Sequence, residues 1–146
     1  MIGRDAILAM IPHAGAMCLW DVVEHWDEAG LMLRSAGHRD PAHPLRSDGM
    51  LRALHLCEYG AQAMAVHGGL LARAGGGTAP PGMLVALRGV QLHVARIDTL
   101  AGDLVGEATV LAHDAASQQY AFRIHHAGHL LAEGRATVML RQPGTG

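Results

Sequence analysis

The pattern of apolar and polar positions divides the chain into one long helical segment with short strands on either side. Residues 50–73 contain no proline and are rich in Ala, Leu and Met, a composition typical of a helix. Their apolar positions are not confined to one stripe, which predicts a helix buried on nearly all sides. Ser47 or Asp48 is the predicted N-cap of this helix.

Short strands are predicted before and after the helix. A short amphipathic helix is expected at the start, and residues 37–49 and 74–82, which are rich in Gly and Pro, are expected to be loops. Turns are predicted at 27–30, 114–117 and 127–128. The simplest arrangement is one antiparallel sheet wrapped around one central helix, an α+β fold. The expected helix spans 4–11, and the expected strands span 17–25, 31–37, 83–89, 90–97, 103–114, 118–126 and 129–140.

Length and composition indicate a single globular domain. The chain has 146 residues, of which 50% are hydrophobic and 16% charged, so we expect one domain over residues 1–146 with a disordered tail at 141–146. The formal net charge of −2 offers no excess of positive charge for nucleic-acid phosphates. The N-terminus has no signal-peptide pattern and no segment is apolar enough to span a membrane, so a cytoplasmic setting is the expectation.

Glu58 is the most informative polar position. It lies in the middle of the predicted helix among Leu54, Cys57 and Ala61. A carboxylate in apolar surroundings must be paired, hydrogen-bonded or protonated, which favours a functional site over a solvent-exposed position. Gln62 follows one helical turn later and is expected to contact Glu58.

Two histidines in the loop that leads into the helix, His38 and His43, are candidate proton acceptors. An imidazole titrates near neutral pH, as few side chains do, but the chain has eleven histidines and either residue alone is a weak signal. His55, one turn before Glu58, is a third candidate base, and His67 is expected on the helix surface. His125, His126 and His129 cluster in a hairpin, yet neighbours on a strand face opposite sides, so no metal site is predicted.

Several segments resemble the hotdog-fold 3-hydroxyacyl-(acyl-carrier-protein) dehydratases. IPHAGAMCLWDVVE resembles the family's entrance segment, and HPLRSDGMLRALHLCEYGAQ its histidine-bearing loop and helix. LVALRGVQLHVARID, DLVGEATV and HLLAEGRATVML resemble its closing strands, so the resemblance covers about residues 8–140. The loop lacks the family's aromatic residues and the Pro-Gly before the helix, which suggests a divergent branch serving fatty-acid-like, polyene or pigment lipid synthesis.

The resemblance implies a homodimer, or a mixed pair with another hotdog subunit, whose active sites combine a histidine of one chain with the acid of the other. The acid would be Glu58. Spacing favours His43 as the base, whereas the preceding glycine favours His38. The base would take a proton beside the thioester carbonyl, and Glu58 would protonate the departing hydroxyl, with Gln62 as its orienting residue.

The substrate would be an acyl carrier protein or coenzyme A thioester, and no metal or other cofactor is expected. Backbone N–H groups at the helix start, from Gly49 to Ala53, would face the thioester oxygen. An apolar tunnel would be lined by Leu54, Met64 and Val85. Arg88 and Arg96 would attract an acidic carrier protein. The alternatives are an acyl thioesterase of the same fold, with Glu58 activating water, and a non-catalytic acyl-binding subunit.

Overall fold

The computed structural model describes residues 1–11, 15–76 and 82–140. Its α-helices are α1 (Arg4–Met10) and α2 (Leu56–Ala74), and the short 3₁₀ turns are η1 (Gly15–Met17), η2 (Gly37–Arg39) and η3 (Ala53–His55). The strands are β1 (Ile2–Gly3), β2 (Val22–Asp27), β3 (Gly30–Ser35), β4 (Gly82–Leu92), β5 (Leu104–His113), β6 (Ser117–His126) and β7 (His129–Leu140).

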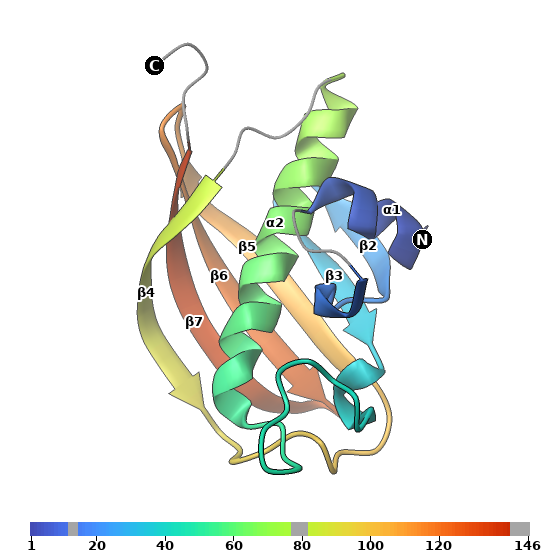
Figure 1. Cartoon of the computed structure of the whole chain (residues 1–146). Coiled ribbons are helices and arrows are strands. Elements are labelled where there is room, and N and C mark those ends of the chain that lie inside the picture. The colour runs from blue at the N-terminus through green and yellow to red at the C-terminus, as the bar shows by residue number, and fades with distance from the viewer. Residues whose placement is uncertain (12–14, 77–81, 141–146) are drawn as a thin grey trace.

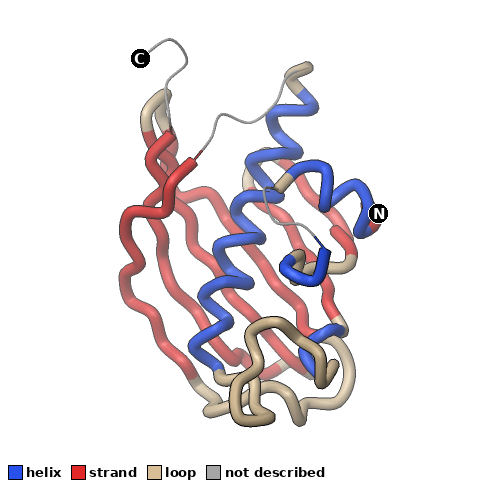
Figure 2. The backbone as a smooth tube through the Cα atoms, in the orientation of Figure 1, coloured by secondary structure: helices blue, strands red, loops and turns tan. Residues whose placement is uncertain are grey.

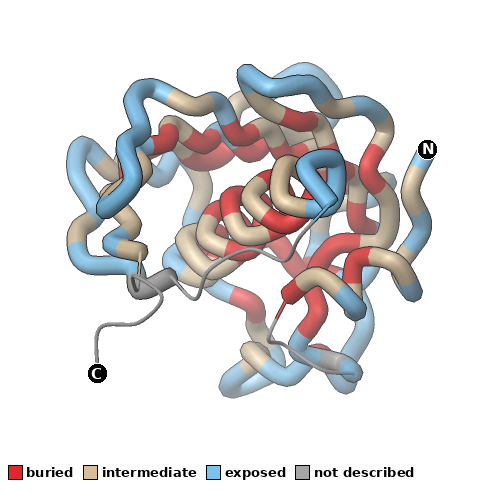
Figure 3. The backbone as a smooth tube through the Cα atoms, turned by 90° about the horizontal axis from the view of Figure 1, so that it is seen from above, coloured by how far each residue is buried: buried red, intermediate tan, exposed pale blue. Residues whose placement is uncertain are grey.

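One antiparallel sheet carries all seven of these strands, in the order β1-β2-β3-β5-β6-β7-β4. The sheet curves around α2, which runs diagonally across its concave face (Figure 1). Seen from above, buried residues gather along α2 and along the strands beside it (Figure 3). This confirms the predicted architecture of a long central helix wrapped by an antiparallel sheet, and it explains why the apolar residues of α2 form no single stripe.

Glycines allow α2 and the N-terminal segment to approach the sheet closely. A Cβ atom at Gly60 would lie 2.7 Å from the ring of Phe122 on β6. A Cβ atom at Gly106 on β5 would lie 2.3 Å from the indole of Trp20. Both aromatic side chains are buried, and the Trp20 Nε1–H donates to the backbone carbonyl of Tyr59 at 2.8 Å. The first turns of α2 are therefore fixed against both β6 and the segment that precedes β2.

The start of the long helix differs from the prediction. α2 begins at Leu56, after η3, and no side chain caps it. Ser47 and Asp48 instead belong to a tight turn that a bridge between Ser47 and Met50 closes, with φ values of 54° at Asp48 and 72° at Gly49. The predicted N-cap was wrong because helical propensity alone could not reveal this turn. Its two central residues, Asp48 and Gly49, lie in the left-handed region.

Most strands follow the prediction, with differences at the N-terminus and in β4. β1 (Ile2–Gly3) was not predicted, and β2 begins at Val22 rather than at residue 17. The two strands expected over 83–97 are replaced by the single strand β4, which ends at Leu92, so residues 93–97 are not part of it. The expected break becomes an irregular register between Arg88 and Gln91, where Gly89 has a φ of 60°. The turns at 114–117 and 127–128 are confirmed, whereas the expected tail at 141–146 and part of the expected loop at 74–82 lie outside the described residues. No helix within the described ranges is long and apolar enough to cross a membrane.

Candidate active site

The loop between β3 and α2 is anchored by an ionic cluster around the buried carboxylate of Asp98. The Asp98 carboxylate accepts the backbone N–H of Leu51 at 2.9 Å and binds the Arg96 guanidinium, with Nε at 3.0 Å. Arg46 lies 4.0 Å from Asp98 and donates to the carbonyls of Gly49 and Arg39 at 3.0 and 2.9 Å. The hydrogen bonds from Arg96 and Leu51 hold the pKa of Asp98 well below its usual range.

His43 lies in the middle of this loop and points inward against α2. Its Nε2 is 3.0 Å from the Tyr59 hydroxyl, and its ring stacks on the Tyr59 ring with 6.2 Å between centroids. Its Nδ1 accepts the backbone N–H of Leu45 at 3.1 Å. Burial, reinforced by the charge of Arg46, lowers the pKa of His43, so the imidazole is neutral near physiological pH.

His38 is fully buried in η2, and its ring nitrogens lie in different environments. Nε2 is 2.8 Å from the carbonyl oxygen of Leu100, and because a carbonyl can only accept, Nε2 carries the proton. Nδ1 is buried and has no hydrogen-bond partner among the described residues. Burial lowers the pKa of His38, so this ring is also neutral and presents a lone pair at Nδ1.

Glu58 lies in the first turn of α2 and is half-buried. Gln62, one turn later and fully buried, donates from Nε2 to the Glu58 carboxylate at 3.4 Å, which agrees with the predicted contact. The Gln62 amide is itself fixed: its oxygen accepts the N–H of Leu19 at 2.9 Å, and its Nε2 donates to the carbonyl of Met17 at 2.7 Å. The segment before β2 thus orients the amide that orients Glu58.

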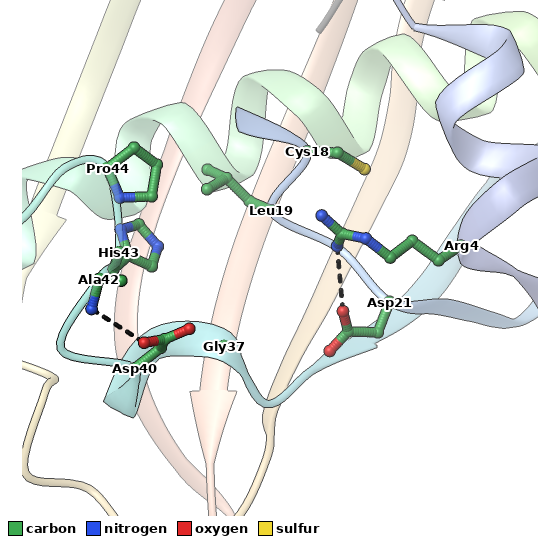
Figure 4. A pocket seen from close by; sticks show the side chains of 9 residues that line it. All are labelled: Arg4, Cys18, Leu19, Asp21, Gly37, Asp40, Ala42, His43 and Pro44. Carbon is green, nitrogen blue, oxygen red and sulfur yellow. Dashed lines mark hydrogen bonds and ion pairs between the residues drawn. The ribbon is translucent and has the colours of Figure 1, made fainter. Parts of the chain in front are cut away.

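A cavity of about 300 Å³ opens beside the His43 loop. Figure 4 places His43 and Pro44 on one side of it and Arg4 and Cys18 on the other, with Leu19 between them. Arg4 pairs with Asp21 at 3.2 Å, so its charge is compensated. The lining also includes Gly37, Asp40 and Ala42, so the space lies between the two histidine-bearing turns and the start of β2.

The residues expected to line an acyl tunnel differ in exposure in the single chain. Met64 is buried in the core, Leu54 in η3 is 65% exposed, and Val85 on β4 is 50% exposed. Gly49 occupies the tight turn before η3 rather than the helix start. Most nearby backbone N–H groups are also committed: those of Met50, Leu51 and Ala53 donate to Ser47, Asp98 and Ala95. The helix N-terminus on which the predicted oxyanion role depends therefore does not lie at residues 49–53, since α2 begins at Leu56.

The two arginines expected to attract a carrier protein differ in their surroundings. Arg96 is bound to Asp98 in the loop cluster, so much of its charge is neutralised. Arg88 is exposed on β4 and lies opposite Arg135 of β7 on the sheet face turned away from α2. The pair lines a second cavity of about 110 Å³ together with Gln119 and Thr137.

The other histidines considered from the sequence have different surroundings. His67 is fully buried rather than exposed on the helix surface, and it bonds the Tyr120 hydroxyl and the carbonyl of Asp27, each at 2.8 Å. His55 is half-buried at the start of α2, and its charge contributes to the lowered pKa of His43. His125 lies 3.1 Å from Glu107. Within the described part of the chain, no group of three metal-ligating side chains converges.

Sequence reasoning missed two residues that shape the site. Tyr59 binds His43 although the two residues are sixteen positions apart, and Asp98 anchors the loop from beyond the end of β4. Tyr59 carried a usable signal, because a buried tyrosine hydroxyl normally has a polar partner. Asp98 carried none, since its partners become neighbours only in the folded chain.

A long helix inside a curved antiparallel sheet is the architecture of a hotdog fold, and in this chain two histidines precede the helix and a carboxylate lies in its first turn. The sequence model of the ApeP-like family, described as ApeP dehydratase, matches residues 5–144. The chain therefore belongs to this dehydratase family, as its resemblance to hotdog dehydratases predicted. No curated protein matches the chain.

Solved structures share the fold. A chain of the dehydratase heterocomplex ApeI:P from Xenorhabdus doucetiae is similar over 94% of this chain and 91% of its own, with a TM-score of 0.83 and 23% identity. AziG from S. sahachiroi is similar over 91% and 99%, with a TM-score of 0.63 and 18% identity. A hypothetical thioesterase with coenzyme A from Streptococcus pneumoniae covers 82% and 84%, with a TM-score of 0.61 and 11% identity.

Proposed function

We propose that this dehydratase removes water from 3-hydroxyacyl thioesters carried by acyl carrier protein or coenzyme A, giving trans-2-enoyl thioesters. The observation that carries the proposal is that candidate proton acceptors and a candidate proton donor both occur around the start of α2. Two neutral imidazoles come from the preceding loop, and a carboxyl group oriented by a fixed amide lies in the first helical turn. An elimination of this kind needs one proton acceptor and one proton donor.

In the proposed reaction, the imidazole takes a proton from C2 of the acyl chain, and the electrons of that bond form the C2–C3 double bond. The C3 hydroxyl leaves with the proton of the Glu58 carboxyl as water. The proton gained by the imidazole returns to the carboxylate through solvent, which closes the cycle. Gln62 would orient the carboxyl group through its hydrogen bond at 3.4 Å.

Both loop histidines remain candidates for the base, and different observations support them. His43 is supported by its place on the cavity wall. His38 is supported by its lone pair at Nδ1, because its proton is held on Nε2 by the carbonyl of Leu100. Single replacements by Gln distinguish them, since loss of the true base should reduce kcat by about 100- to 10,000-fold.

We propose that the working site is completed by a second hotdog subunit. The printed contacts of the single chain join His43 to Tyr59 and Leu45, and join Glu58 to Gln62. β4 forms one free edge of the sheet (Figure 2) and exposes Leu84, Val85 and Leu87 by 40% to 50%. An apolar strand edge of this kind is suited to pairing with the edge of another sheet. The partner is a second copy of this chain or a related subunit, as in the ApeI:P heterocomplex.

One assay tests the reaction. The protein is incubated with a 3-hydroxyacyl carrier protein or a short thioester mimic, and products are followed by mass spectrometry, alone and with a candidate partner subunit. The loss of one water with the thioester intact is the expected result. Release of free thiol would instead indicate the thioesterase alternative, for which the similar fold of the pneumococcal protein is the support. If no product forms with any partner subunit, the remaining alternative is that the chain is a non-catalytic acyl-binding subunit.

Matched variants tie the activity to the proposed residues. Glu58→Gln removes the proton donor but preserves the shape of the side chain, so enoyl formation should fall at unchanged stability. His113→Gln, at an exposed position on β5, is the control and should keep full activity. Arg88→Glu should raise KM for a carrier-protein substrate but not for a small mimic, because only the protein presents an acidic surface.

A further inference from the structure

Two buried histidines of this fold are each bonded to a buried tyrosine. His43 lies 3.0 Å from the Tyr59 hydroxyl, and His67 lies 2.8 Å from the Tyr120 hydroxyl. The second nitrogen of each ring bonds the backbone, but in opposite directions. His43 accepts a hydrogen bond from the N–H of Leu45, whereas His67 donates one to the carbonyl of Asp27. The two pairs therefore hold their rings in different proton arrangements.

The proton arrangement of His43 follows from its two partners. A backbone N–H can only donate, so Nδ1 must accept the Leu45 N–H and cannot carry a proton itself. A neutral imidazole carries one proton, which must then lie on Nε2 and is donated to the Tyr59 hydroxyl oxygen. In the His67 pair the directions are reversed, because Nε2–H donates to a carbonyl and the Tyr120 hydroxyl donates to Nδ1.

We propose that Tyr59 is a positioning residue for the dehydration: its hydroxyl oxygen holds His43 in one orientation and one tautomer, with the lone pair on Nδ1. The inference rests on the proposed function, in which His43 is a candidate base. Stacking against the Tyr59 ring fixes the plane of the imidazole, and the hydrogen bond fixes its rotation within that plane. Tyr59 is itself immobile, because it is fully buried and packs edge-on against Trp20.

The same contact tunes the basicity of His43. Proton uptake occurs at Nδ1 and replaces the single hydrogen bond from Leu45. The ring is then an imidazolium, and its Nε2–H bond to Tyr59 becomes charge-assisted and stronger. Tyr59 therefore opposes the effects of burial and of nearby cations on the ring. The charged and titratable groups that face His43, besides Tyr59, are Arg46, His55, Asp40 and His38.

Tyr59→Phe tests the inference, with Tyr120→Phe as its matched control. Each variant removes one buried hydroxyl that is bonded to one buried histidine, but only the first touches His43. Nitrogen NMR of the imidazole rings reports the tautomer and the pKa of His43, identified by its absence from a His43→Gln variant. Enoyl formation is measured on the same samples over a range of pH, with any partner subunit that the wild type requires.

The expected result in Tyr59→Phe is a lower pKa of His43 and a mixed or altered tautomer. The acid limb of the pH–rate profile should move to lower pH, and kcat should fall about 10- to 100-fold with little change in KM. Tyr120→Phe should leave the His43 spectrum and the profile as in the wild type. A fluorinated tyrosine incorporated into the Tyr120→Phe background alters only the Tyr59 phenol and should lower the pKa of His43 without changing side-chain shape, even if Tyr59→Phe does not fold.

Two results would overturn the inference, and they are distinguishable. If the His43 tautomer and pKa are the same in the wild type and in both Tyr59 variants, Tyr59 does not control the ring, whatever the rate does. If the ring changes as expected but turnover does not, Tyr59 controls the ring without serving the reaction. That second result would also remove His43 from the proposed mechanism and leave His38 as the base.

Discussion

The Asp98 carboxylate accepts the backbone N–H of Leu51 at 2.9 Å and so joins the segment after β4 to the loop that carries both candidate bases. Its side chain is only 4% exposed and also binds Arg96 and approaches Arg46. The loop has little regular structure of its own, so its conformation depends on this cluster rather than on local propensity.

Asp98→Asn should therefore lower both stability and activity. Asparagine preserves an oxygen for Leu51 but removes the charge that Arg96 and Arg46 face. Because hydrogen bonds from Arg96 and Leu51 depress the pKa of the folded-state carboxyl, its contribution is present above the unfolded pKa and is lost as pH falls through the folded pKa. Urea unfolding should show a gap between wild type and variant near neutral pH that narrows in acid.

Asp103→Asn is the control for this experiment. Asp103 lies 3.9 Å from Arg34, and its side chain is 40% exposed, so the loss of its charge should change stability little at any pH. An equal loss of stability in the two variants would contradict the role assigned to the Asp98 cluster.

Gln62→Leu should destabilise the fold and remove the hydrogen bonds that link Glu58 to the segment before β2. The variant leaves the buried N–H of Leu19 without its acceptor, which costs about 1–3 kcal/mol. It also removes the donor to Glu58, so enoyl formation should fall further than stability alone explains. Gln118→Leu, at a half-buried position at the start of β6, is the control. Thermal unfolding measures the loss of stability, and the product assay measures the loss of enoyl formation.

The sequence predicted much of the architecture because local patterns specify it. The helix over α2, the hairpin turns and most strand positions were predicted from apolar periodicity and from the turn preferences of Gly and Asp. Glu58 and Gln62 were predicted as a contacting pair because one helical turn separates them. These features need only neighbours in sequence.

What the sequence could not predict depends on contacts between distant segments. His67 was expected on the helix surface, yet Tyr120 on β6 and the end of β2 provide partners for both its nitrogens. Leu54 was expected in an acyl tunnel along the helix, and the structure places it in η3 with its side chain 65% exposed in the single chain. No periodicity distinguishes these outcomes, since the deciding partner lies on another element.

Two glycines of α2 provide a matched test of how closely the helix approaches the sheet. A Cβ atom at Gly60 would lie 2.7 Å from the Phe122 ring, whereas a Cβ atom at Gly68 would meet nothing within 4 Å. Gly60→Ala should destabilise the fold, because overpacking costs about 1–3 kcal/mol and exceeds the gain in helix propensity. Gly68→Ala should stabilise it by up to about 1 kcal/mol. Unfolding free energies measured in urea would contradict the close approach if both variants gained stability.

The two tyrosines of the chain should ionise only when the protein unfolds. Both are fully buried, and burial raises the pKa of Tyr120 to about 12 and that of Tyr59 further still. Since a phenol is neutral below its pKa, the unfolded chain loses phenolic protons from about pH 10 upward while the folded chain retains them. The stability tied to these groups is therefore complete below that range and is lost as pH rises through the folded-state values.

Phenolate absorbance and circular dichroism followed together in an alkaline titration measure this coupling. The expected result is a single transition in which phenolate appears with the loss of secondary structure, and in Tyr120→Phe half of the absorbance change should remain. Phenolate that appears at lower pH, before any loss of structure, would mean that at least one hydroxyl is reached by solvent. If Tyr59 were the exposed one, the hydrogen bond that positions His43 could not be the buried contact on which its tautomer depends.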